Sequence, residues 1–189
     1  RVFATGGIGG VHRGAADSFD ISHDLQSLAR SRAVTVCAGA KAILDLPKTL
    51  EYLETAGVCV IGYQTSSFPA FYSRDSGLPL EYSAESADVI ARAFAAREQL
   101  GLPGGILVAA PIPVEYEIPA DQIGASIDLA VAQAAECGVH GKDVTPFLLA
   151  SLARITAGRS VEANLALLEN NARVGAGIAK AISALARQV

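Results

Sequence analysis

The chain has 189 residues, a formal charge of −4 at neutral pH and an apolar fraction of 51%. A chain of this length fits one α/β domain, so we expect a single domain over residues 1–189. The acidic balance offers no basic patch for a nucleic acid and favours a small-molecule ligand. Charges interrupt each apolar stretch before it reaches membrane-spanning length, and the three widely separated cysteines suit a core in a reducing compartment. We therefore expect a cytoplasmic protein without membrane contact.

Aromatic residues make up only 6% of the chain, so its apolar content is mainly aliphatic. Short aliphatic runs therefore predict the strands. Val2–Ala4, Val34–Cys37, Val58–Tyr63 and Ile106–Ala110 are typical of buried parallel strands with helices on both faces. Helices are expected at Leu25–Arg30, Thr49–Ala56, Ser83–Leu100, Asp121–Glu136, Lys142–Ala157 and Ser160–Arg187, with Ser83, Thr145 and Ser160 as caps of their helices. The predicted class is α/β, as three α/β/α layers around a mostly parallel sheet. Because the chain opens on a strand-like run, it is also expected to be a piece of a longer protein.

The stretch Val34–Lys41 ends a buried strand in small residues followed by a lysine. Ligands of open parallel sheets bind at the carboxyl ends of the strands, so Lys41 is placed at a crevice. A lysine amine in apolar surroundings loses its proton more easily, and the neutral amine is a nucleophile. The alternative is a lysine that reaches the surface at the start of the next helix.

Two polar or flexible segments precede this strand. Thr5–Gly14 holds five glycines, which favours close backbone approach, either to an anion or at a structural crossing. Ala16–Asp24 is dense in oxygen and nitrogen ligands, and Asp20 and Asp24 would share a face of a helix there. Ser22 or Asp20 alternatively only caps the helix that follows.

Two later segments are also unusual. Gln64–Pro79 is rich in Ser, Pro, Gly and aromatic residues, which is typical of a lid or a binding loop. Asn164, Asn170 and Asn171 lie inside the last predicted helix, although asparagine is a poor helix former. They are either exposed to solvent or aimed into a site.

Several of these strings resemble the pseudouridine-5′-phosphate glycosidase family, also called indigoidine synthase A-like proteins. The matching strings are Val2–Gly14, Phe19–Leu25, Val36–Lys41, Ile43–Leu46, Glu51–Thr55, Thr145–Leu149 and Asn170–Arg173. The resemblance extends along the whole chain and corresponds to the carboxyl-terminal two thirds of the family fold. It implies a homotrimer with an α/β/α core that reversibly splits pseudouridine 5′-phosphate into uracil and ribose 5-phosphate with a divalent metal, commonly manganese.

The resemblance also implies roles for individual residues. Lys41 corresponds to the Schiff-base nucleophile and Asp20 to the metal ligand. Residues matched to substrate contacts are Ser22, His23 and Asp24, together with Thr5, His12 and Asn164 around the same pocket.

The chain departs from the family pattern in two respects. It reads Ala109-Ala110-Pro111 where the family usually has an asparagine before the proline, so a polar contact near the pocket is expected to be lost. The family also carries an amino-terminal segment with a glutamate proton donor and a phosphate-binding lysine, and this sequence contains neither. If the sequence is the whole polypeptide, we expect it to be inactive or severely impaired.

The chemistry implied by the resemblance agrees with a lysine nucleophile. A carbon–carbon glycosidic bond has no leaving heteroatom to protonate, so the two-carboxylate mechanism of ordinary glycosidases does not apply. Two alternatives remain open: a phosphosugar-binding or assembly module without turnover, and another Schiff-base enzyme acting on sugar phosphates.

Overall fold

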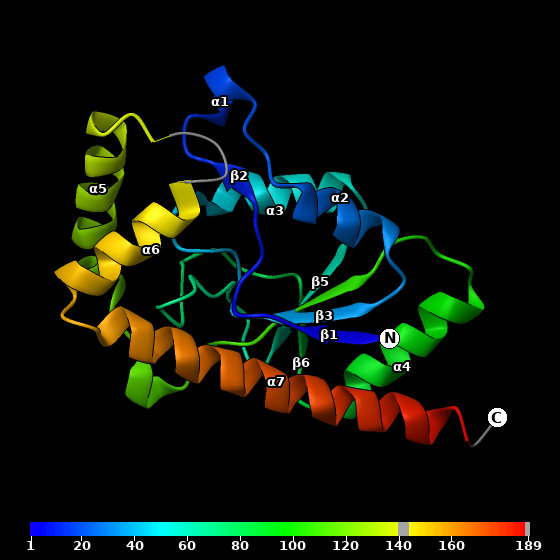
Figure 1. Ribbon diagram of the computed structural model, residues 1–189. Helices are drawn as coiled ribbons and strands as arrows, with labels where there is room; N and C mark the ends of the chain where they lie inside the picture. The colour runs from blue at the N-terminus through cyan, green and yellow to red at the C-terminus, as the bar shows by residue number, and fades with distance from the viewer. Residues whose placement is uncertain (140–143, 188–189) are drawn as a thin grey trace.

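A five-stranded parallel sheet forms the centre of the computed structural model, which describes residues 1–139 and 144–187 (Figure 1). In spatial order its strands are β1 (Val2–Ala4), β3 (Val34–Cys37), β7 (Ile106–Ala109), β5 (Cys59–Tyr63) and β6 (Tyr82–Ala84). Val34 pairs with Val2 on one side and with Ile106 on the other. The carboxyl ends of all five strands therefore meet at one edge of the sheet.

Helices cover both faces of this sheet. On one side lie α2 (His23–Arg30) and α3 (Leu46–Thr55), and on the other lie α4 (Ala87–Gln99) and α7 (Arg159–Leu185) (Figure 1). A helix pair, α5 (Ala120–Glu136) and α6 (Val144–Ile155), packs together beyond one end of the sheet. The short elements are α1 (Ala15–Ser18), the 3₁₀-helix η1 (Val114–Tyr116), and β2 (Val11–His12), which pairs antiparallel with β4 (Leu44–Asp45). This is the expected three-layer α/β/α architecture.

Alternating side chains along the central strands build two separate cores. Val34, Val36 and Val108 pack with Ile90 and Ile178 on the α4 and α7 side. On the α2 and α3 side, the core contains Cys37, Leu107, Ala109, Leu25 and Leu53. Both faces of the central strands β3 and β7 are covered, so all their residues except Thr35 are apolar, which explains their aliphatic runs.

Two expected helix starts are wrong. Ser83 lies in the edge strand β6, and α4 begins at Ala87 after Ser86. The last helix begins at Arg159 after Gly158, so Ser160 is not its cap. Ser160 is buried instead, and its hydroxyl accepts a hydrogen bond from Thr156 Oγ1 at 3.0 Å.

Other expectations had mixed outcomes. Strands β3, β5 and β7 and helix α5 are confirmed to within a residue or two. The expected start at Lys142 lies outside the described residues, and α6 is described from Val144, so Thr145 falls inside its first turn. Cys37 is buried as expected, but Cys137 is exposed, because it ends α5 at the surface. Within the described part of the chain, no helix is long and apolar enough to cross a membrane.

Candidate active site

The glycine-rich turn, residues Thr5–Gly10, runs beside the end of β3. Thr5 N donates to Val36 O at 3.0 Å, and Ala38 N donates to Gly6 O at 2.8 Å. Further along, Ile8 N donates to Gly39 O at 3.1 Å and Lys41 N donates to Ile8 O at 3.0 Å. The parallel backbone pairing of β1 and β3 thus continues past both strands, and the glycines serve a close approach of backbone to backbone. The backbone around Lys41 is fixed directly by the turn.

Glycine is required here by close packing. A Cβ atom at Gly39 would lie 2.0 Å from Pro69 O, and this residue has φ +89°. A Cβ atom at Gly7 would lie 2.6 Å from the ring of Phe71. Neither position has room for a side chain, so the glycines bring three segments of backbone together.

Lys41 follows this paired segment at the carboxyl edge of the sheet, and its side chain is half-buried. Its carbonyl accepts a hydrogen bond from Leu44 N at 3.0 Å, which begins the turn into β4. Cys37, four residues earlier, is fully buried, and this burial raises the pKa of its thiol to about 12. The thiol therefore stays protonated at neutral pH and is a poor nucleophile.

The polar segment Asp17–Asp24 contacts the turn from outside. Asp20 is not helical, so the expected shared helix face with Asp24 is wrong. Its carboxylate instead lies 3.7 Å from His12 Nδ1, and His12 N donates to Asp20 O at 3.0 Å. The side chain of Asp20 is 44% exposed. The segment therefore presents this carboxylate to solvent beside β2.

The first turn of α2 approaches the same glycines. Asp24 Oδ2 accepts a hydrogen bond from Gly9 N at 2.7 Å, and Ser22 N donates to Gly10 O at 3.0 Å. Ser22 Oγ also accepts from Asp24 N, which confirms Ser22 as the cap of α2. Capping thus explains Ser22, while Asp24 additionally holds the turn. His23 is exposed, and in the described part of the chain no hydrogen bond joins its side chain to the turn.

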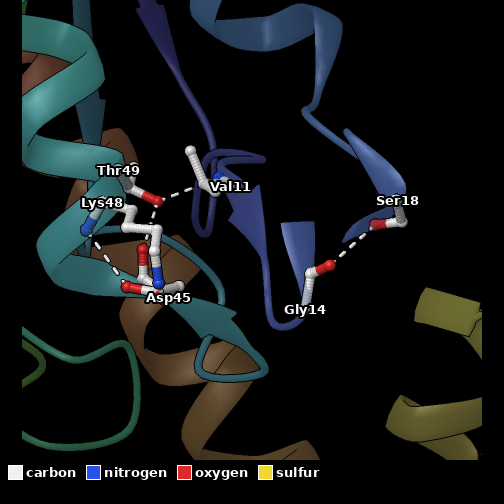
Figure 2. Close-up of polar contacts among 6 residues, drawn as sticks. All are labelled: Val11, Gly14, Ser18, Asp45, Lys48 and Thr49. Atoms are coloured by element: carbon white, nitrogen blue, oxygen red, sulfur yellow. Dashed lines mark hydrogen bonds and ion pairs between the residues drawn. The ribbon is translucent and has the colours of Figure 1, made fainter. Parts of the chain in front are cut away.

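Helix α3 fixes the other end of the glycine-rich segment. The buried Thr49 hydroxyl donates to Asp45 O at 2.7 Å and accepts from Val11 N at 3.0 Å (Figure 2). Asp45 caps α3 and forms an ion pair with Lys48, and the Lys48 side chain holds the pKa of the Asp45 carboxyl below its usual range. Sequence reasoning did not identify Thr49, because a threonine in a helical pattern carries no sign of its partner.

The segment Gln64–Pro79 forms a packed wall. Phe68, Phe71 and Tyr72 are buried, and Phe71 N donates to Ala38 O at 3.0 Å. Phe71 adopts a left-handed backbone with φ 64°. The buried aromatic residues of the segment thus pack behind the glycines, while its role as a lid or a binding loop stays a prediction.

The three asparagines of α7 lie in different surroundings. Asn171 is fully buried, so solvent exposure is wrong for this residue, and its Nδ2 donates to Thr5 O at 2.8 Å. Asn164 is half-buried, and its Oδ1 would lie 3.3 Å from a Cβ atom at Gly6. Asn170 is half-buried and donates to Pro111 O at 3.3 Å. Helix α7 therefore contacts the ends of both β1 and β7.

A cavity of about 390 Å³ opens beside this arrangement. Its lining includes Thr5, Asp24 and Ile8, together with the exposed Phe3 of β1. Lys41 is not among its lining residues. The structure thus brings Thr5 and Asp24 to one hollow, with the Lys41 backbone joined to it through Ile8.

The donors available for a metal are few. In residues 1–139 and 144–187 no cluster of three or more His, Cys, Asp or Glu side chains is placed to hold an ion. The exposed Asp20 carboxylate beside His12 fits a single anchor for a hydrated divalent cation, since such ions keep several waters and share other ligands with substrate phosphates.

Comparison with known proteins gives consistent matches to pseudouridine-5′-phosphate glycosidases. The protein of that name from Methylobacterium nodulans is 58% identical over 182 residues, which cover 96% of this chain and 54% of that protein. The one from Caldanaerobacter subterraneus subsp. tengcongensis is 53% identical over 188 residues, covering 100% of this chain and 61% of that protein. The chain therefore spans somewhat more than half the length of these relatives.

Solved structures give the same result. The prealnumycin C-glycosynthase AlnA, determined with ribulose 5-phosphate, superposes with a TM-score of 0.92 at 39% identity, covering 100% of this chain and 62% of AlnA. An indigoidine synthase A-like protein from Thermotoga maritima gives a TM-score of 0.85 at 40% identity, with coverage of 95% and 58%. The family model described as "Indigoidine synthase A like protein" matches residues 1–181. The chain belongs to the indigoidine synthase A-like family.

Proposed function

We propose that this chain carries the lysine-bearing part of a pseudouridine-5′-phosphate glycosidase, with Lys41 as nucleophile. The observation that supports this most directly is the placement of Lys41 at the carboxyl edge of the sheet, with its backbone joined to the glycine-rich turn. The names of the relatives at 53–58% identity support the substrate, pseudouridine 5′-phosphate. A sugar phosphate also accompanies AlnA in its solved structure.

The reaction follows from an amine at this position. The neutral Lys41 amine attacks C1′ of the ribose, a C–N bond forms, and the ring C–O bond breaks as its oxygen takes a proton. The nitrogen lone pair then forms a C=N bond while the C–C bond to uracil breaks, and a proton is added to the uracil carbon. Water hydrolyses the iminium, which releases ribose 5-phosphate and restores the amine.

The surrounding residues have supporting roles. The phosphosugar is proposed to be oriented by the backbone of Thr5–Gly10. Side chains proposed to contact it are Thr5, Ser22, Asp24, His12, His23 and Asn164. Asp20 would hold a divalent cation, which we propose to be Mn²⁺, and such a cation neutralises anionic oxygens when it is bound. We further propose that the active species is a cytoplasmic homotrimer.

A second function is a phosphosugar-binding or assembly module without turnover. It is favoured by one observation: Thr5 and Asp24 line the cavity beside the glycine-rich turn, and Lys41 does not. In this alternative the fold binds ribose 5-phosphate, but the group that protonates uracil is supplied elsewhere or is absent.

Borohydride trapping with ribose 5-phosphate tests the role of Lys41. The reverse half of the reaction needs only the amine and the open-chain aldehyde, so trapping does not require the uracil proton donor. We expect a reduced adduct on the peptide that contains Lys41, detected by mass spectrometry, and no adduct in Lys41→Met. Lys180→Met is the matched control, because Lys180 is exposed on α7.

Two other outcomes separate the alternatives. An adduct on another lysine would refute the assignment of Lys41. An adduct on Lys41 without release of uracil from pseudouridine 5′-phosphate would identify the module without turnover. Release of uracil would identify the complete glycosidase.

A further inference from the structure

Asn171 lies in the middle of α7 with its side chain fully buried. Asparagine is among the weaker helix formers, and a buried amide loses its hydration. Leu167, one turn earlier on the same helix, is also fully buried, which shows that an aliphatic side chain suits this face of α7. The position therefore requires an explanation other than helix stability.

The amide nitrogen of Asn171 supplies that explanation. Nδ2 donates to Thr5 O at 2.8 Å and to Gly6 O at 3.1 Å. Because both partners are carbonyl acceptors, the NH₂ group must face them and the amide oxygen must face away. In the described residues Oδ1 is buried and has no hydrogen-bond partner. The side chain thus leaves an acceptor unpaired while it holds the first two residues of the glycine-rich turn.

The same turn connects Asn171 to the reacting lysine. Gly6 O also accepts from Ala38 N at 2.8 Å, so the amides of Asn171 and Ala38 share one carbonyl. Two residues further, Ile8 pairs with Gly39 and Lys41 through the backbone. A shift of Gly6 therefore moves the backbone to which Lys41 is attached.

We infer that Asn171 is a positioning residue, which holds the Thr5–Gly6 turn against Ala38–Lys41 so that Thr5 and Lys41 keep the geometry needed for a phosphorylated sugar. The link to a phosphosugar rests on the proposed function, whereas the anchoring of the turn does not. Asn171 is not itself among the residues that line the cavity, and it acts through the carbonyls of Thr5 and Gly6.

Asn171→Leu tests this inference, with Asn170→Leu as the matched control. Both substitutions improve helix propensity equally, but Asn170 contacts Pro111 and not the turn. In Asn171→Leu we expect an unchanged or higher melting temperature. We also expect amide hydrogen exchange at least tenfold faster at Ala38 and Ile8, while Thr35 and Val36 in β3 stay within twofold of the wild type. Asn170→Leu should leave all four amides within twofold.

Trapping with ribose 5-phosphate gives the functional readout. Asn171→Leu should raise the half-saturating concentration at least tenfold, and Asn170→Leu should change it less than twofold. Unchanged exchange at Ala38 and Ile8 would overturn the inference, and so would an equal increase at Thr35 and Val36, which would indicate a purely structural role. If Asn171→Leu does not fold, Asn171→Ala removes the same donor without adding volume, and the same criteria apply. If the wild type forms no adduct, the proposed function fails, but the exchange data still decide the role of Asn171.

Discussion

The lysine segment Ala38–Lys41 and the polar segment Asp17–Asp24 both contact the glycine-rich turn, but they are held very differently. Ala38 and Ala40 are fully buried, and backbone bonds from the turn fix the segment along its length. In the polar segment Phe19 is 82% exposed and Asp20 is 44% exposed. The lysine backbone is thus positioned by the fold itself, whereas the Asp20 carboxylate lies on a largely exposed segment.

The contacts of the polar segment sharpen this difference. Ser22 and Asp24 contact Gly10 and Gly9 in the glycine-rich turn, and Asp20 contacts His12 just after it. The turn is therefore shared by both segments, and a change on one side is expected to reach the other through it. Substitutions in Ala38–Lys41 should therefore lower the free energy of unfolding by a different amount from substitutions in Asp17–Asp24.

The largest effect is expected from Gly39→Ala in the lysine segment. Its φ of +89° is unfavourable for alanine, and the added Cβ would lie 2.0 Å from Pro69 O. Left-handed backbone alone costs about 1–2 kcal/mol, so with the clash we expect a loss of at least about 3 kcal/mol. Gly14→Ala is the control, because it has φ +77° and open space, and should lose only about 1 kcal/mol. Equal losses in urea denaturation would contradict the close packing described for Gly39.

Asp24→Ala should have an intermediate effect. It removes the hydrogen bond from Gly9 N at 2.7 Å and a negative charge in the first turn of α2. For an exposed carboxylate we expect a loss of about 1–1.5 kcal/mol. Asp88→Ala removes an exposed first-turn charge from α4 and should cost about 0.5 kcal/mol. Denaturant midpoints would distinguish the two, and an equal loss in both would mean that the bond to Gly9 contributes nothing.

A smaller, pH-dependent effect is expected at Asp45, which caps α3 next to Thr49. Lys48 lowers the pKa of the Asp45 carboxyl, so the carboxylate contributes stability above its unfolded pKa, near 3.9. This contribution is lost as the pH falls below that value and through the lower folded pKa. Because Lys48 is largely exposed, we expect less than about 1 kcal/mol. Asp45→Asn should flatten this part of the stability curve between about pH 5 and pH 2; a curve that stays parallel to the wild type would refute it.

Asp20→Asn should change stability least and metal binding most. The carboxylate is 44% exposed and lies 3.7 Å from His12, so we expect less than about 0.5 kcal/mol in unfolding. Calorimetry with Mn²⁺ should show at least tenfold weaker binding than in the wild type. Asp17→Asn, also in the polar segment, should bind Mn²⁺ normally. Weak Mn²⁺ binding in both variants, or normal binding in both, would refute the proposal that Asp20 anchors the cation.

Regular periodicity accounts for what the sequence predicted well. Runs such as Val34–Cys37 and Ile106–Ala109 are covered on both faces, so all their residues except Thr35 are apolar, and the strands follow from the pattern. Strand β6 was missed because Tyr82–Ala84 is short, lies at a sheet edge and has two exposed residues. A serine in such a stretch resembles a helix cap when neighbouring strands are unknown.

The sequence indicated which segments of the candidate site matter, but it did not reveal the contacts between them. The small residues before Lys41 indicated close approach, and the structure places the turn there. The partners of Asn171 and Thr49 lie 166 and 38 residues away, so no local pattern reveals them. Similarly, the left-handed backbone of Phe71 depends on the surrounding packing and is invisible in a list of residues.

Strand β1 lies at the end of the sheet order, and Phe3 on it is 60% exposed. Backbone N–H and C=O groups along such an edge can pair with another extended polypeptide, and proteins usually protect them with charged side chains or with a covering helix or loop. In residues 1–139 and 144–187 no other strand pairs with the outer side of β1, so this edge is open to such pairing.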